Sequence, residues 1–148
     1  DLLPCGLGAR DTLRTEMGYP LHGQDLSPTI TPVQAGLGWA VGWSKAEFIG
    51  AEALREERAA GAAVLLRGLK SVGRAIPRPG MAVLDADGHQ VGRVTSGTFS
   101  PTLSVGVGLA LIDRIVPLGS RIGVAVRDRV EEFDVVKPPF VTPAVREA

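Results

Sequence analysis

The chain has 148 residues, of which 16 are Lys or Arg, 16 are Asp or Glu, and 45% are hydrophobic. This length allows one domain, or the end of one domain followed by a small second domain, with enough apolar residues for a packed core. The balanced charge argues against nucleic acid or an anionic membrane as a partner, because both select basic surfaces.

Two helices and one strand are predicted in the first sixty residues. A helix is expected from about Gly8 to Met17, because Gly18 suits its C-terminal cap and Pro20 discourages continuation. Residues 18–32 are rich in turn formers and are expected to form a loop. Over residues 36–43, every second residue is large, which predicts a strand. Residues 51–60 predict a charged helix that ends at Gly61.

After Gly61, short runs of valine, isoleucine and leucine alternate with turn residues. These runs predict strands over residues 64–69, 81–84, 90–96, 105–112, 121–126 and 130–136, with hairpin turns at 85–88 and 127–129. The glycines at 106 and 108 suggest a bend or a close backbone approach. Short strands without an intervening helix favour a small antiparallel barrel or sandwich. The predicted class is therefore α+β, with a boundary near Gly61.

Three features of the sequence bear on the compartment in which the protein acts and on the extent of the chain. No apolar run approaches the roughly 20 residues that span a bilayer. The single cysteine, Cys5, has no partner for an internal disulfide, which fits a reducing compartment such as the cytoplasm. The chain begins at Asp1 without a methionine, which favours the carboxy-terminal part of a longer protein, with a processed full chain as the alternative.

The first helix carries the residues of greatest chemical interest. Arg10 and Arg14 are four residues apart and share one helix face. Ala9, Leu13 and Met17 share another face, which is apolar. An arginine fork suits a carboxylate or a flat heterocycle with adjacent acceptors. From the residues alone, however, a structural ion pair is the favoured role for Arg10.

Other possible sites are weaker. Gly6 and Gly8 resemble the start of a dinucleotide fingerprint, but Asp11 stands at the third glycine position and no strand precedes them. Asp11 itself would be stabilised by the positive end of the helix dipole. Ser96 and Ser100 lack the spacing of a nucleophile elbow and are interpreted as turn formers. Histidines 22 and 89 are distant, the first in a loop and the second beside a predicted turn, so no metal cluster is expected.

Four stretches, in order, carry a family resemblance: residues 6–14, 31–39, 92–103 and 137–141. Together they resemble the T-protein (aminomethyltransferase) family of the glycine cleavage system over nearly the whole chain. The resemblance implies the end of a ferredoxin-like folate-binding region in residues 1–60 and a small antiparallel β-barrel in residues 61–148. It also implies that the chain is the carboxy-terminal part of a longer protein.

The resemblance implies a reaction and its partners. An aminomethyl group on the lipoyl arm of H-protein gives its methylene to tetrahydrofolate, and ammonia is released. Tetrahydrofolate is the one-carbon acceptor, no metal is implied, and the setting is the bacterial cytoplasm. Alternatives are the folate-binding part of a dimethylglycine or sarcosine oxidase, a folate protein of iron–sulfur assembly, or a non-catalytic barrel that binds a partner.

The resemblance assigns a folate contact to Arg10 as the substrate-binding residue of this chain. The family's catalytic aspartate and pterin-binding glutamate would lie upstream of Asp1, so no catalytic residue is expected here. Family members often place an aromatic residue near the folate shortly after the Pro-Phe-Val segment, whereas this chain has residues TPAV at 142–145. Gln34 stands where glutamate is common in the family.

Overall fold

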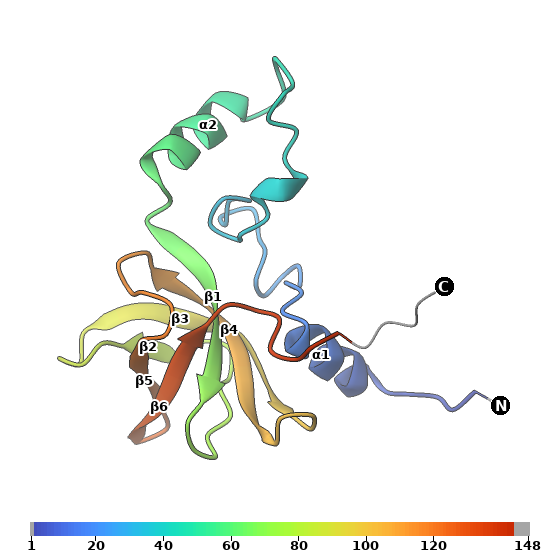
Figure 1. Ribbon diagram of the computed structural model, residues 1–148, viewed down its shortest axis with the longest axis vertical. Coiled ribbons are helices and arrows are strands. Elements are labelled where there is room, and N and C mark those ends of the chain that lie inside the picture. Colours follow the sequence, from blue (N-terminus) through green and yellow to red (C-terminus); the bar gives the residue numbers. More distant parts are fainter. Residues whose placement is uncertain (1, 144–148) are drawn as a thin grey trace.

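Six antiparallel strands close into a barrel in the computed structural model, which describes residues 2–143 (Figure 1). The strands are β1 (Val64–Ser71), β2 (Ala82–Leu84), β3 (Gln90–Ser100), β4 (Val105–Asp113), β5 (Arg121–Val126) and β6 (Arg129–Val136). Their order around the barrel is β1-β4-β3-β2-β5-β6, and β6 pairs back with β1. The β1–β6 ladder that closes the barrel covers residues 68–71 of β1, whereas residues 64–67 of β1 pair with β4 alone. The predicted antiparallel barrel and the α+β class are confirmed.

The barrel core is built from alternate residues of the strands. On β6, for example, Phe133 and Val135 are fully buried, whereas Asp134 between them is only half-buried. The period of two places one set of side chains inside the barrel and the other set outside.

The glycines of β4 have a separate role, because a Cβ atom at Gly106 would lie 2.1 Å from the carbonyl oxygen of Ala75. The predicted close backbone approach at Gly106 is therefore confirmed.

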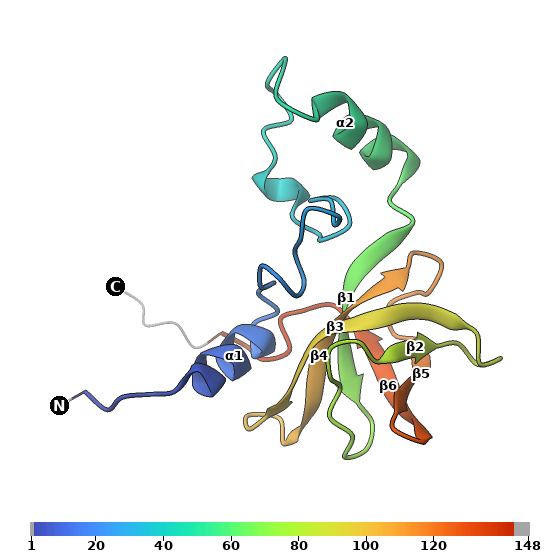
Figure 2. The ribbon, with the colours of Figure 1, turned by 180° about the vertical axis from the view of Figure 1, so that it is seen from behind.

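Helix α1 (Leu7–Glu16) lies against the barrel beside β3 and β4 (Figures 1 and 2). It ends in a Schellman motif, in which Gly18 N–H donates to Thr15 and Tyr19 N–H donates to Arg14. Gly18 has a φ of +69°, so it takes the left-handed conformation that this motif requires. The predicted cap at Gly18 is confirmed.

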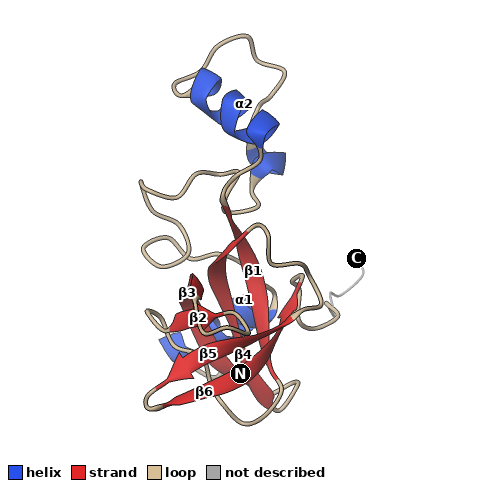
Figure 3. Cartoon of the chain, turned by 90° about the vertical axis from the view of Figure 1, so that its left-hand side faces the viewer, coloured by secondary structure: helices blue, strands red, loops and turns tan. Residues whose placement is uncertain are grey.

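Helix α2 (Ala51–Ala60) stands away from the barrel and is followed by Gly61, with a φ of +79° (Figure 3). The predicted end of this helix at Gly61 is confirmed. Contacts cross the connection between α2 and the barrel, because Arg114 donates to the carbonyl oxygens of Ala60 and Gly61. The division into domains at 1–60 and 61–148 stays a prediction.

The strand predicted over residues 36–43 is wrong. The structure has a 3-10 turn, η1 (Gly38–Ala40), with turns on both sides. The indole N–H of Trp43 donates to the carbonyl oxygen of Gly38 at 2.6 Å, and Arg58 lies 4.4 Å from the ring centroid of Trp43. These local contacts fold the segment back on itself.

A strand also needs a ladder with a neighbour, and the backbone hydrogen bonds of residues 36–43 run within the segment and to the residues just before it rather than to a barrel strand. The N–H of Leu66 on β1 donates instead to the carbonyl oxygen of Gln34, just before the segment, at 2.7 Å.

Candidate functional site

A buried ion pair joins α1 to the loop that follows it and to β3. Arg14 is 8% exposed and Asp25 is 0% exposed, and Arg14 Nη1 lies 2.7 Å from Asp25 Oδ2. Arg14 Nη2 donates to Ser96 Oγ at 2.8 Å, and Arg14 Nε donates to Asp11 Oδ1 at 2.8 Å. The guanidinium is therefore held by side chains from three separate segments.

The buried carboxylate of Asp25 is also fully hydrogen-bonded. It accepts hydrogen bonds from the hydroxyls of Thr95 and Ser96 and from the backbone N–H of Leu21 at 2.9 Å. Burial of a charge is tolerated only with such complete pairing. We call the set Asp11, Arg14, Asp25, Thr95 and Ser96 the junction network, because it fixes α1 against the barrel.

The structure corrects two interpretations drawn from the sequence, those of Ser96 and Asp11. Ser96 is not a turn former, because it lies within β3 and is buried between Arg14 and Asp25. The first turn of α1 contains no acidic residue, and Asp11 lies beyond that turn. The carboxylate of Asp11 therefore pairs with Arg14 rather than with the helix dipole. For Ser96 the cation lies 82 positions away along the chain and no local spacing reveals it, whereas Asp11 and Arg14 are three residues apart on one helix.

A second buried carboxylate anchors the end of α1. Glu16 is buried and accepts hydrogen bonds from the hydroxyls of Ser100 and Thr102 and from the N–H of Thr102 at 3.3 Å. Ser100 also accepts from the N–H of Leu103 at 3.0 Å, so its turn-forming role holds. The backbone N–H of Phe140 donates to the carbonyl oxygen of Glu16 at 2.8 Å. The carboxy-terminal segment is thus bound to the same helix end.

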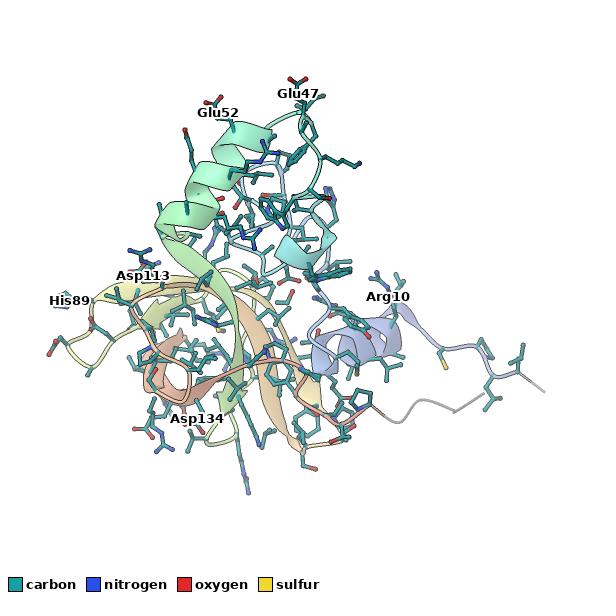
Figure 4. All side chains as sticks on the ribbon, turned by 45° about the horizontal axis from the view of Figure 1, so that its top comes forward. Arg10, Glu47, Glu52, His89, Asp113 and Asp134 are labelled. Carbon is teal, nitrogen blue, oxygen red and sulfur yellow. The ribbon has the colours of Figure 1, made fainter. Side chains whose placement is uncertain are left out.

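Arg10 has the opposite environment to Arg14. It is exposed, and it forms no ion pair or side-chain hydrogen bond with any residue from 2 to 143. Figure 4 shows its side chain extending from α1 away from the barrel. The structural ion pair favoured for Arg10 from its residue type is instead made by Arg14, so the guanidinium of Arg10 has all its donors available.

A shallow hollow of about 430 Å³ lies beside Arg10. Its wall contains Leu13, which is 63% exposed, together with Met17 and Tyr19. Cys5, Gly6, Ala9 and Arg14 complete the lining, which includes no carboxylate. The predicted apolar face of the helix is therefore open to solvent within the described residues. Two arginines line the hollow, but the donors of Arg14 are already bonded, so Arg10 offers its free donors beside an apolar wall. This arrangement suits a flat ligand that carries acceptor atoms.

The histidines lie elsewhere. His22 is exposed in the loop after α1, outside the Arg10 hollow. His89 lies in the turn between β2 and β3, and Figure 4 places it on the opposite side of the molecule from Arg10. Neither histidine contributes to the surface around Arg10.

The turn between β2 and β3 does bring three possible metal ligands together, Asp85, Asp87 and His89, with ligand atoms within 4.8 Å of one another. The spacing of histidine and cysteine in the sequence does not indicate this grouping, because two of its three members are aspartates. Asp85 Oδ1 accepts the backbone N–H groups of His89 at 2.8 Å and Asp87 at 2.9 Å. The hydrogen bond from the His89 backbone is the largest cause of the lowered pKa of Asp85. Turn formation accounts for this arrangement.

Comparison with known proteins identifies the family. The family model described as "Glycine cleavage T-protein C-terminal barrel domain" matches residues 65–142, which include most of the barrel. The chain belongs to the glycine cleavage T-protein family. A second family model, described as "GCVT N-terminal domain", matches residues 1–45, which include α1 and the loop after it.

T-protein relatives with curated names match nearly the whole chain. An aminomethyltransferase of Frankia alni is 70% identical over 138 residues, covering 93% of this chain and 38% of the relative. An aminomethyltransferase of Mycobacterium bovis is 61% identical over 145 residues, covering 97% of this chain and 39% of the relative. The chain therefore spans less than half the length of these relatives.

A solved T-protein structure has the same fold. The crystal structure of glycine cleavage system aminomethyltransferase T from Bartonella henselae matches with a TM-score of 0.87 and 36% identity. The match covers 92% of this chain and 39% of that chain. Within residues 2–143, no helix has the length and apolar character needed to cross a membrane. Ala144 and Val145, which stand where the family aromatic is expected, lie outside the described residues.

Proposed function

We propose that the protein takes part in aminomethyl transfer in the glycine cleavage system. In this reaction the methylene of the aminomethyl group on lipoylated H-protein passes to tetrahydrofolate, and ammonia is released. The proposal is supported by membership of the T-protein family and by aminomethyltransferase relatives at 70% and 61% identity. H-protein and tetrahydrofolate are the proposed partners, and the bacterial cytoplasm is the proposed location.

The exposed guanidinium of Arg10 at the edge of an apolar hollow is the structural observation that carries this proposal. Tetrahydrofolate combines flat rings with amide and carboxylate acceptors. The wall of Leu13, Met17 and Tyr19 offers apolar contact for rings, and Arg10 offers donors for an acceptor group. Arg14 cannot take this role, because its donors are already occupied within the junction network.

Binding and orientation are the contributions that we assign to this chain. Transfer of a one-carbon unit to a folate nitrogen depends on positioning and on an ordered path for protons. The helix that carries Arg10 is held against the barrel by the buried contacts of Arg14 and Glu16. Arg10 therefore projects from a rigid support, which limits the entropy that is lost when a ligand binds.

Replacing Arg10 by alanine is expected to weaken tetrahydrofolate binding by about 1–3 kcal/mol, the range for losing a charged hydrogen bond. Isothermal calorimetry on a full-length protein, which includes the expected pterin-binding glutamate, measures this change. Arg93→Ala is the matched control, because Arg93 is also exposed but lies on β3 outside the hollow. Equal folate affinities for wild type and Arg10→Ala would exclude Arg10 from the site.

A chimera tests the proposed activity. The chain would replace the matching region of the Frankia alni aminomethyltransferase, of which it covers 38%. The chimera is expected to form methylenetetrahydrofolate from aminomethylated H-protein. The 148-residue chain alone is expected to form none, because the family resemblance assigns the catalytic aspartate to a position outside it. A folded chimera that binds folate without transfer would instead favour a binding module.

A further inference from the structure

Helix α2 and the loop before it project from the barrel. Figures 1 to 3 show α2 standing away from the six strands, whereas α1 lies against them. Within residues 2–143, α2 has no extensive contact with a strand or with α1. A helix of ten residues is marginal in water by itself, and helices in proteins are stabilised mainly by the packing of one face. Helix α2 therefore needs more contact than the barrel gives it.

The contacts that α2 does make hold the preceding loop against it. Arg55 donates to the carbonyl oxygens of Lys45 and Ala46. The same guanidinium lies 5.7 Å from the ring centroid of Phe48. The loop and the helix thus form one preorganised unit, so little conformational entropy is lost when its outer face meets a partner.

The outer face of this unit has an apolar centre. An open hollow of about 1010 Å³ extends along residues 46–56. Ile49 lines it and is fully exposed, and Ala53 in the first turn of α2 is also exposed there. A large apolar side chain that is fixed on a rigid, solvent-facing hollow suits burial against another protein surface.

Carboxylates surround this apolar centre. Glu47, Glu52 and Glu56 line the hollow, are exposed, and form no ion pair with a residue from 2 to 143. Figure 4 shows Glu47 and Glu52 at the outer end of the projection. Arg55 also lines the hollow, but its guanidinium is already bonded to the backbone. The surface of residues 46–56, which we call the α2 tip, therefore suits a partner with an apolar site and a basic rim.

The lengths of the relatives indicate which partner covers the α2 tip. The match to the Frankia alni aminomethyltransferase covers 38% of that protein, so most of its length has no counterpart in this chain. The model of the GCVT N-terminal domain matches up to residue 45, and the model of the barrel domain matches from residue 65. Helix α2 lies on the connection between these two parts. In the longer relatives, this connection leads from the barrel to a much larger region.

We propose that, in a full-length T-protein, the α2 tip docks on the region that precedes the sequence of this chain in the relatives. Ile49 fills an apolar site on that region, and the carboxylates of the α2 tip pair with basic groups at its rim. This contact holds the connection to the barrel rigid. The inference rests on membership of the T-protein family and is independent of folate binding and of aminomethyl transfer.

Hydrogen exchange of the α2 backbone amides tests the proposal. It is measured in the 148-residue chain and in the chimera with the Frankia alni relative, at the same concentration. Exchange is expected to be at least about 10-fold slower in the chimera, because docking suppresses local opening of the helix. Equal exchange of α2 in the two proteins, with the barrel strands protected in both, would overturn the proposal.

Substitutions in the chimera identify the surface that is covered. Ile49→Asp is expected to return α2 to the exchange rate of the 148-residue chain. Ile115→Asp is the matched control, because Ile115 is 79% exposed in the turn after β4, and it should keep the protection. Full protection of α2 in Ile49→Asp would overturn the proposal. If Ile49→Asp does not fold, Glu52→Gln/Glu56→Gln decides, because it removes only exposed carboxylates and should still exchange faster than wild type at α2.

Self-association gives a different result. Protection of α2 that is already present in the 148-residue chain and rises with its concentration would place a second copy on the α2 tip and would overturn the proposal. The proposed function is scored separately, by the formation of methylenetetrahydrofolate. A chimera that protects α2 without forming this product would support the docking and contradict the function.

Discussion

Replacing Asp25 by alanine is expected to lower the free energy of unfolding by about 3–5 kcal/mol, the range for breaking a buried ion pair by removing one partner. Asp25 is fully buried and accepts hydrogen bonds from Arg14, Thr95 and Ser96. Its loss leaves the guanidinium of Arg14 buried and only partly compensated by the half-buried carboxylate of Asp11. Urea denaturation followed by circular dichroism measures the change.

Two controls separate charge burial from loss of packing. Asp87→Ala removes an exposed carboxylate in the turn between β2 and β3 and should change stability by less than about 0.5 kcal/mol. The double variant Arg14→Met/Asp25→Leu removes both buried charges and should be more stable than Asp25→Ala alone. A loss of less than about 1 kcal/mol for Asp25→Ala would show that the junction network contributes little to folding.

Replacing Phe133 by alanine is expected to cost about 3–5 kcal/mol, because the deletion leaves a cavity in the barrel core. Phe133 is 0% exposed and belongs to the same buried cluster as Leu69, Ile122 and Val135. The surrounding strands are closed on themselves, so they have little freedom to collapse into the space. Thermal and urea unfolding both report this loss.

The matched control for Phe133→Ala is Phe99→Ala on β3, where the phenylalanine is 45% exposed. This substitution removes the same atoms but creates no closed cavity, so its cost should be much smaller, about 1 kcal/mol or less. Equal losses for the two variants would contradict the role of Phe133 as a buried member of the core.

Helix α1 carries both the buried Arg14, which affects folding, and the exposed Arg10, which is expected to affect folate binding. The junction network holds the second half of this helix, and Arg10 projects from the turn before it. We therefore expect a folded variant with a weakened junction to position Arg10 less well. The Arg10→Ala substitution, by contrast, should leave stability nearly unchanged, because Arg10 is exposed and makes no ion pair within residues 2–143.

Local signals in the sequence were sufficient for most of the secondary structure. The end of α1 at Gly18 and the end of α2 at Gly61 follow from the left-handed conformation that glycine adopts at low cost. The barrel strands follow from their short runs of valine, isoleucine and leucine and from the turn residues between them. These signals act over a few residues, so they are readable before any tertiary contact is known.

Local sequence patterns mislead where the structure of a segment depends on a distant partner. The alternation over residues 36–43 has the period of a strand, but these residues form local turns and no ladder with a barrel strand. Ser96 has the composition of a turn, but it becomes a buried strand residue because Arg14 and Asp25 supply its hydrogen bonds. Propensity is overridden in both cases by contacts that lie outside the local sequence.

The sequence by itself determined the two helices, the barrel strands and the four stretches that carry the family resemblance, including Arg10. Only the tertiary structure decided which arginine is buried. Arg14 and Arg10 are one turn apart, yet only Arg14 meets Asp25 and Ser96, the second of them 82 positions away along the chain. Burial and ion pairing are set by such distant neighbours, and they leave Arg10 exposed beside the hollow.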